Sequence, residues 1–192
     1  MRMARKWVFL VCLLSWLKIP LLTAAQEGIF LKEDEAPKAV FPDAMVFDRQ
    51  VVRSTEDLRE KIRQRMGKTK TSLWEASYIT YVARQGNRIL GYAVIVEEIG
   101  KHRPITFVVG VGSDRKIRDV ALMVYREAYG GEVKDQRFLR QYRGKNENDP
   151  MLPFRDIQNI SGATMSVEAI GRGTKKALAI VDAIYFGEGT VK

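Results

Sequence analysis

Three hydroxyl residues surround a Gly-Ala pair in the sequence ISGATMS, just before a predicted helix. The hydroxyls are Ser161, Thr164 and Ser166, and the pair is Gly162-Ala163. Any of the three could cap the helix by accepting a hydrogen bond from its orphan N–H groups. A cap explains only one hydroxyl, however. The small pair keeps side-chain bulk away from the turn, and the positive end of a helix favours a phosphate. The pattern therefore also predicts a site for a phosphate-bearing ligand.

Side chains that commonly carry out catalysis are scarce in this chain. Cys12 is the single cysteine and His102 the single histidine. Because Cys12 lies in a segment that we expect to be removed, disulfides, thiolate iron–sulfur clusters and zinc–thiolate sites are excluded from the mature protein. His102 lies in a turn-like stretch before Pro104, which is typical of a solvated loop histidine. No metal site is predicted, and we expect any chemistry to be carried by a bound group.

The first 25 residues have the order of a secretory signal peptide. Three basic residues precede an apolar run from Trp7 to Leu17, and small residues follow up to Ala25, after which cleavage is predicted. An uncleaved anchor is the alternative, but the run is shorter than the roughly 20 apolar residues of a membrane span. Removal takes away four of the 32 basic residues and none of the 23 acidic ones. We therefore expect a mildly basic, exported protein, periplasmic or on the extracytoplasmic face of the membrane, that does not bind nucleic acid.

Residues 26–69 are predicted to form an N-terminal arm and a helix. The arm, up to about Val52, is rich in turn residues and is expected to pack on the core through four apolar anchors: Val40, Phe41, Val46 and Phe47. The stretch Ser54-Thr55-Glu56-Asp57 combines a hydroxyl cap with early acidic residues, and Gly67 follows at the expected end. This pattern predicts a helix between them.

Residues 70–187 are predicted to form an α+β domain with an antiparallel meander and a C-terminal helix. Alternating apolar residues indicate four strands joined by short turns, over residues 73–84, 88–98, 104–111 and 117–125. A long excursion follows over residues 125–154, with a short helical piece at 135–142, and long excursions are often functional. From Val167 the apolar positions follow helical period until Gly187.

The hydroxyl cluster and the strands before it resemble the FMN-binding domain family, found in the G subunit of the Rnf complex and the C subunit of the sodium-pumping NADH:quinone reductase. ISGATMS, with Asp156 five residues before Ser161, resembles the family's attachment motif. The run from ILGYAVIVEEIG to DVALMVYRE is similar to the family's strands, and FLRQYRGK, residues 138–145, to its segment before the attachment site. The resemblance covers about residues 70–185 and implies an α+β fold with an antiparallel sheet and a helix behind the attachment turn.

The resemblance implies that Thr164 is esterified by the phosphate of FMN, with Ser161, Gly162, Ala163 and Ser166 around it. The family's flavin-contact loop would be Glu127-Ala128-Tyr129-Gly130-Gly131, where Ala-Tyr replaces the family's Thr-Pro and the glycines are adjacent. Two glycines permit close backbone approach to a flat ligand, and Tyr129 offers a ring for stacking. A basic residue from 137–145 is expected to meet the phosphate charge.

In this family a separate flavin transferase attaches FMN from FAD with magnesium, so such an enzyme is an expected partner. The leading hypothesis is an electron carrier that works with membrane or extracytoplasmic redox proteins rather than a stand-alone enzyme. A small exported FMN-dependent reductase with its own substrate is one alternative. A flavin-free adaptor domain is another. The sequence has no nicotinamide-binding glycine fingerprint, which argues against the reductase.

Overall fold

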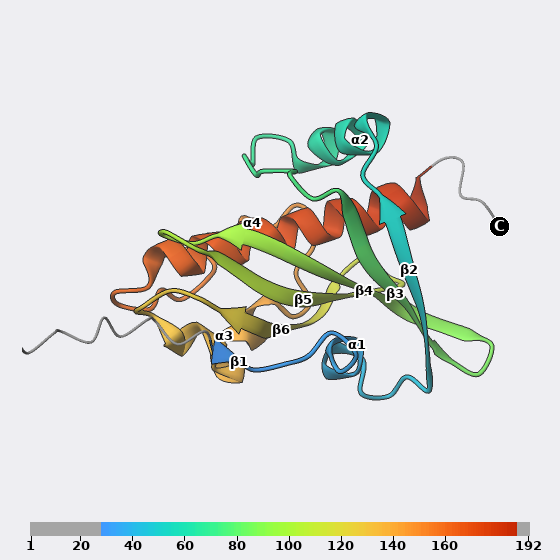
Figure 1. Ribbon diagram of the computed structural model, residues 1–192, viewed down its shortest axis with the longest axis horizontal. Coiled ribbons are helices and arrows are strands. Elements are labelled where there is room, and N and C mark those ends of the chain that lie inside the picture. The colour runs from blue at the N-terminus through green and yellow to red at the C-terminus, as the bar shows by residue number, and fades with distance from the viewer. Residues whose placement is uncertain (1–27, 188–192) are drawn as a thin grey trace, which may run out of the picture.

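A computed structural model describes residues 28–187, and the predicted signal peptide lies outside this range. Six strands form one antiparallel sheet in the order β1-β6-β5-β4-β3-β2 (Figure 1). The strands are β1 (Gly28–Ile29), β2 (Val46–Arg53), β3 (Ser77–Gln85), β4 (Arg88–Ile99), β5 (Pro104–Gly112) and β6 (Ile117–Tyr125). The predicted meander is therefore β3 to β6, and the α+β class with an antiparallel sheet is confirmed.

Two strands of the sheet come from the segment predicted to be an arm, which corrects that prediction. β1 pairs with β6, and β2 pairs with β3 along its whole length, from Val46 opposite Arg84 to Arg53 opposite Ser77. β2 is an edge strand with mostly exposed side chains, so no alternation of apolar residues reveals it. Val46 is exposed and anchors nothing, whereas Val40 and Phe41 are fully buried as predicted.

The helices are α1 (Ala36–Val40), α2 (Glu56–Met66), α3 (Gln136–Leu139) and α4 (Thr164–Val181), which continues as a π-helical turn, η3, over Asp182–Phe186. Two 3-10 turns, η1 (Gly131–Lys134) and η2 (Arg140–Tyr142), flank α3. α2 begins and ends as predicted, because Thr55 Oγ1 accepts a hydrogen bond from the Leu58 N–H at 3.2 Å and Gly67 follows the last turn. Among residues 28–187, no helix combines the length and the apolarity that a membrane span requires.

Helices cover both faces of the sheet, and each face has its own apolar layer. α4 packs on one face over a core that includes Phe107, Val109 and Ile170, with α2 packed against α4, and α1 covers the other face through Val40 and Phe41 (Figure 1). Because both faces are buried, the ends of the strands and the loops there are the places left for an open site.

A fully buried lysine of α4 explains why β3 begins at Ser77 rather than at the predicted residue 73. Lys176 Nζ donates hydrogen bonds to the Ser72 carbonyl at 3.3 Å and to Glu75 Oε1 at 2.7 Å, and it lies 3.0 Å from Glu98 Oε1. A buried ammonium needs such partners. Residues 72–75 therefore bind the helix instead of extending the strand.

Two glycines let α4 approach the rest of the chain very closely. A Cβ at Gly171 would lie 2.1 Å from the carbonyl oxygen of Met151, and one at Gly173 would lie 2.4 Å from the ring of Phe107. Both distances are shorter than carbon atoms allow, so the position of α4 depends on the missing side chains.

We predict that Gly171→Ala destabilises the protein by about 1–3 kcal/mol, because overpacking against a backbone carbonyl outweighs the roughly 1 kcal/mol gain in helix propensity. Denaturant unfolding of the two proteins measures the difference. Gly131→Ala is the control, since a Cβ there meets nothing within 4 Å. Equal stability of Gly171→Ala and the wild type would show that α4 is not held by this contact.

Candidate functional site

A cavity of about 510 Å³ lies where the N-terminus of α4, the β4–β5 turn and the loop after β6 meet. Its lining residues are Lys101, His102, Glu127, Ala128, Tyr129, Gly162, Ala163, Thr164, Met165 and Ser166. The structure thus brings together the two segments that the sequence singled out, which are well separated in the chain. Among the predicted residues, Ser161, Gly130 and Gly131 do not line the cavity.

Thr164 is the first residue of α4, and its side chain is partly exposed at the cavity wall. Its hydroxyl oxygen, Oγ1, accepts a hydrogen bond from Asn159 Nδ2 at 2.9 Å. The hydroxyl is therefore neither sealed in the core nor used to cap the helix.

The N-terminus of α4 has no side-chain cap among the described residues, so none of the three hydroxyls takes the capping role that the sequence left open. The N-cap position is Ala163, and Ser161 is exposed without capping the helix end. The first N–H groups of an uncapped helix are unsatisfied and carry the positive end of its dipole. Because this end opens onto the cavity, an anionic group can bind there.

Ser166 and Gly130 join the start of α4 to the loop after β6. Ser166 is buried, and its Oγ lies 3.0 Å from the hydroxyl of Tyr125, which also donates to the Tyr129 carbonyl. A Cβ at Gly130 would lie 2.7 Å from the Cβ of Ala163, and the backbone of Gly130 is left-handed, with φ +82°. Ser166 also lines the cavity, as predicted, whereas Gly130 does not line it and shapes the site by packing.

The carboxylate of Glu127 holds the β4–β5 turn against the cavity. Its Oε1 accepts hydrogen bonds from the backbone N–H groups of His102 at 2.7 Å and Arg103 at 3.1 Å. Desolvation raises the pKa of Glu127, but these N–H groups outweigh it and hold the pKa below its ordinary value. Glu127 therefore positions the β4–β5 turn at the cavity, and its carboxylate stays ionised at neutral pH.

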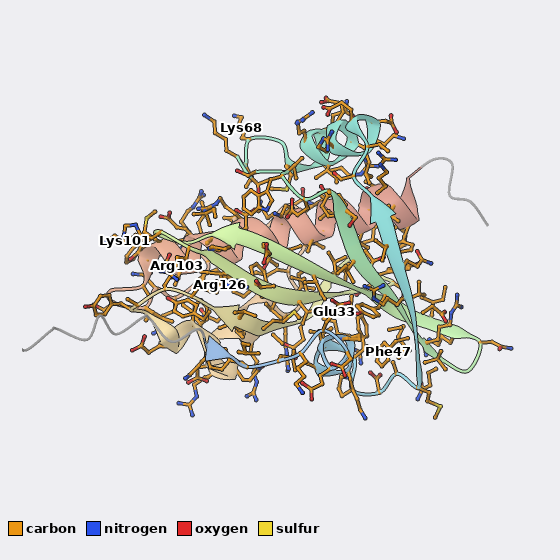
Figure 2. The ribbon with its side chains drawn as sticks, in the orientation of Figure 1. Glu33, Phe47, Lys68, Lys101, Arg103 and Arg126 are labelled. Carbon is orange, nitrogen blue, oxygen red and sulfur yellow. The ribbon has the colours of Figure 1, made fainter. Side chains whose placement is uncertain are left out.

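The rim of the cavity is exposed, aromatic and basic. The Tyr129 side chain is 84% exposed and Met165 is 46% exposed, so both are accessible to a flat ligand or to a partner. Lys101 lines the cavity, and Figure 2 shows it with Arg103 and Arg126 at the same end of the molecule. Among the lining residues the charge of Lys101 offsets that of Glu127, so the N-terminus of α4 is the part of the cavity that favours an anion.

Two of the four basic residues of 137–145 are held elsewhere, which narrows the expectation that one of them meets a phosphate. Arg143 pairs with Asp119, and Lys145 Nζ lies 2.8 Å from Asp156 Oδ2. Arg137 lines a neighbouring cavity of about 310 Å³ that Asn159 also lines. Arg137 therefore lies beside the loop of Asn159, whereas Lys101 lines the main cavity itself.

Asp156 braces the loop that leads to Thr164. Its carboxylate accepts hydrogen bonds from the N–H groups of Met151 at 3.0 Å and Leu152 at 2.9 Å, in addition to the ion pair with Lys145. Desolvation raises the pKa of Asp156, but Lys145 and the two N–H groups together lower it below its ordinary value. The role of this motif residue is therefore to hold the loop rather than to line the cavity.

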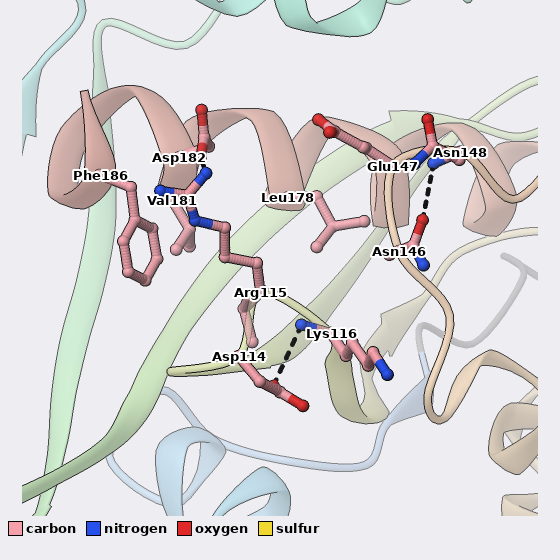
Figure 3. A pocket seen from close by; sticks show the side chains of 11 residues that line it. Asp114, Arg115, Lys116, Asn146, Glu147, Asn148, Leu178, Val181, Asp182 and Phe186 are labelled. Atoms are coloured by element: carbon pink, nitrogen blue, oxygen red, sulfur yellow. Dashed lines mark hydrogen bonds and ion pairs between the residues drawn. The ribbon is translucent and has the colours of Figure 1, made fainter. Parts of the chain in front are cut away.

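Another cavity, of about 190 Å³, lies toward the C-terminal end of α4 (Figure 3). Its apolar side includes Leu178 and Phe186, and the guanidinium of Arg115 lies 4.6 Å from the Phe186 ring centre and 3.2 Å from Asp182 Oδ1. It contains none of the predicted site residues. Within residues 28–187, no group of three or more metal-ligating side chains is found.

Sequence reasoning missed Lys101, Tyr125 and Asn159 and set His102 aside as a solvated loop residue. Asn159 lies only two residues before Ser161, so proximity to the motif was an available signal. Lys101 and His102 reach the cavity only because the β4–β5 hairpin is long enough to bring its turn beside α4, which no local pattern encodes.

The residues that line the 510 Å³ cavity lie in a part of the chain that matches a known protein family. Residues 100–179 match the family model described as FMN-binding domain, and this range contains every residue that lines the 510 Å³ cavity. The G subunit of the proton-translocating ferredoxin:NAD(+) oxidoreductase complex of Clostridium ljungdahlii is 28% identical over 116 residues, which cover 56% of this chain and 62% of that protein. The chain therefore spans less than two thirds of that relative.

Two solved structures are similar to this chain. The C subunit of the Na(+)-translocating NADH-quinone reductase from Parabacteroides distasonis has a TM-score of 0.49 and 15% identity, with 79% of this chain and 83% of that chain covered. NqrC from Shewanella oneidensis has a TM-score of 0.46 and 17% identity, with 78% and 82% covered.

We predict that Asp156→Asn costs on the order of 1–3 kcal/mol of stability at pH 7, because it removes the charge from a carboxylate with three donors. A carboxyl whose pKa is lower in the folded than in the unfolded protein stabilises the folded protein fully at pH values above its unfolded pKa of about 3.9. This stabilisation is lost as the pH falls through the folded pKa. The gap between wild type and Asp156→Asn should therefore close between about pH 5 and pH 2.

Denaturant unfolding over this pH range measures the gap. Asp34→Asn is the matched control, since Asp34 is exposed, and it should change stability little at any pH. A gap for Asp156→Asn that stays constant down to the acid end of the range would contradict the assigned role.

Proposed function

Because the chain belongs to the FMN-binding domain family, we propose that the cavity at the N-terminus of α4 holds FMN, attached through a phosphoester to Thr164. The single observation that supports this most strongly is the position of the Thr164 hydroxyl, at the cavity wall and on the first residue of an uncapped 18-residue helix. A phosphate on that oxygen would meet the unsatisfied N–H groups directly.

The residues present fit the group. A phosphodiester keeps one negative charge, which the helix N-terminus stabilises by about 0.3–1 kcal/mol, and Lys101 adds a cation to the same cavity. The exposed Tyr129 offers a ring face to the isoalloxazine, and the small pair Gly162-Ala163 leaves the approach to Thr164 open. The FMN supplies the redox chemistry when bound, and this chain binds, orients and electrostatically surrounds it.

We propose that the protein is an extracytoplasmic electron carrier that exchanges electrons with a membrane redox complex. The relative from Clostridium ljungdahlii is part of a proton-translocating oxidoreductase complex, which supports a partner of this class. The predicted signal peptide supports export. Outside the cytoplasm a dissociated flavin is diluted, so a covalent bond keeps each protein loaded. A flavin transferase is then required for maturation.

A reductase with its own substrate is the second candidate, and one observation favours it. His102 lines the same cavity as Thr164, so an acid–base side chain is available beside the flavin. Its backbone N–H is bound to Glu127, which fixes the turn but leaves the exposed imidazole able to face a substrate.

We predict that the wild type, co-expressed with a flavin transferase, gains the mass of one FMN-phosphoryl group and that Thr164→Ala does not, because the ester oxygen is gone. Intact-protein mass spectrometry and the visible absorption spectrum check this. Ser161→Ala is the matched control and keeps the added mass, since Ser161 is exposed outside the cavity lining. An unmodified wild type, or a modified Thr164→Ala, would refute the proposal.

We further predict that His102→Asn leaves the rate of electron exchange between the flavoprotein and artificial redox partners within about twofold of the wild type, as expected when no proton transfer by His102 is needed. Arg103→Gln, on the same turn, is the control. Steady turnover of a soluble substrate by the wild type that drops about 100-fold in His102→Asn alone would instead establish the reductase. Stopped-flow spectroscopy in the flavin bands measures both the rate of electron exchange and the turnover of the substrate.

A further inference from the structure

Asn159 contacts the hydroxyl that the proposed function singles out. Its Nδ2 donates to Thr164 Oγ1 at 2.9 Å, and its own oxygen, Oδ1, is buried with no hydrogen-bond partner among the described residues. An unsatisfied buried carbonyl costs stability. The placement of Asn159 against Thr164 thus lowers the stability of the folded protein, which points to a role of Asn159 in function rather than in folding.

The segment before Asn159 is held by several contacts, so the amide is in place before any ligand arrives. Asp156 binds the start of the loop through the N–H groups of Met151 and Leu152. The N–H of Gln158 donates to Gln141 Oε1 at 2.7 Å. Ile157 is buried between these contacts. Asn159 therefore reaches Thr164 from a fixed backbone.

We infer that Asn159 is a positioning residue that orients the Thr164 hydroxyl for phosphoryl transfer, an inference that rests on the proposed function. Because Nδ2 is the donor, Oγ1 uses one lone pair as acceptor and its own proton stays free to be removed. The same N–H stabilises the negative charge that develops on Oγ1 as the proton leaves. An apolar or acidic side chain at this position provides neither effect.

In the phosphoryl transfer to Thr164, FAD donates the FMN group. Thr164 Oγ1 attacks the phosphorus that carries the flavin half, a new O–P bond forms, and the P–O bond of the pyrophosphate bridge breaks. AMP leaves, and the hydroxyl proton passes to a base of the flavin transferase. No oxidation or reduction takes place, so the step needs no further reactant.

The test is the rate at which purified apoprotein gains FMN from FAD, with Mg²⁺ and a purified flavin transferase, followed by intact mass at several apoprotein concentrations. Asn159→Leu and Asn159→Asp are expected to lower the maximal rate by about tenfold or more. The Asp variant should be the slower, because a carboxylate accepts the hydroxyl proton and repels the phosphate. The half-saturating apoprotein concentration should change less than about twofold, since the transferase still docks on the same surface.

Gln158→Leu and Gln158→Glu are the matched controls, because they make the same changes at the exposed neighbouring residue and should react at the wild-type rate. Thermal unfolding verifies that all variants are folded. An unchanged maximal rate in the Asn159 variants overturns the inference, as does an equal loss in the Gln158 controls or an effect confined to the half-saturating concentration. If the wild type gains no FMN, the proposed function fails as well, so the two failures are distinguishable.

Discussion

The close contact of α4 with the backbone at Met151 and with the ring of Phe107 determines the geometry of the candidate site. With glycine at 171 and 173 the helix touches its neighbours without room for a methyl group, so it cannot slide or rotate without a clash. Thr164 lies about two turns before this contact on the same helix. The packing around Gly171 and Gly173 therefore determines where the unsatisfied N–H groups of the helix N-terminus lie.

Two carboxylates then position the walls that the helix does not supply. Glu127 binds the β4–β5 turn through its backbone, and Asp156 binds the loop that precedes Thr164. Backbone N–H groups lower the pKa of Glu127, and Lys145 together with backbone N–H groups lowers the pKa of Asp156, in each case despite desolvation. A site that must admit a large planar group thus has a preformed frame, and its accessible side chains, Tyr129 and Met165, lie on the rim.

The sequence predicted those parts of the molecule whose pattern is local. Apolar segments separated by turn residues indicated the strands β3 to β6, and the bounds of β6 matched. β2 was missed because an exposed edge strand shows no such alternation, and the late start of β3 depends on Lys176, about a hundred residues away. The motif pointed to Thr164 with two interpretations, a helix cap and a phosphate site, and the structure excludes the cap because Ala163 takes the N-cap position. The hydrogen bond from Asn159 depends on the fold of a loop, which spacing alone does not specify.

The contact between Gly130 and Ala163 restricts how this site can diverge. The loop and the helix start meet there without space for one additional carbon atom, so neither position can accept a larger residue unless the other segment shifts. Variation in the volume available to a cofactor must therefore arise at the solvent side, where Tyr129 and Met165 are exposed. Homologous chains with different redox properties are expected to differ at Tyr129 and Met165 and to keep the contact between residues 130 and 163.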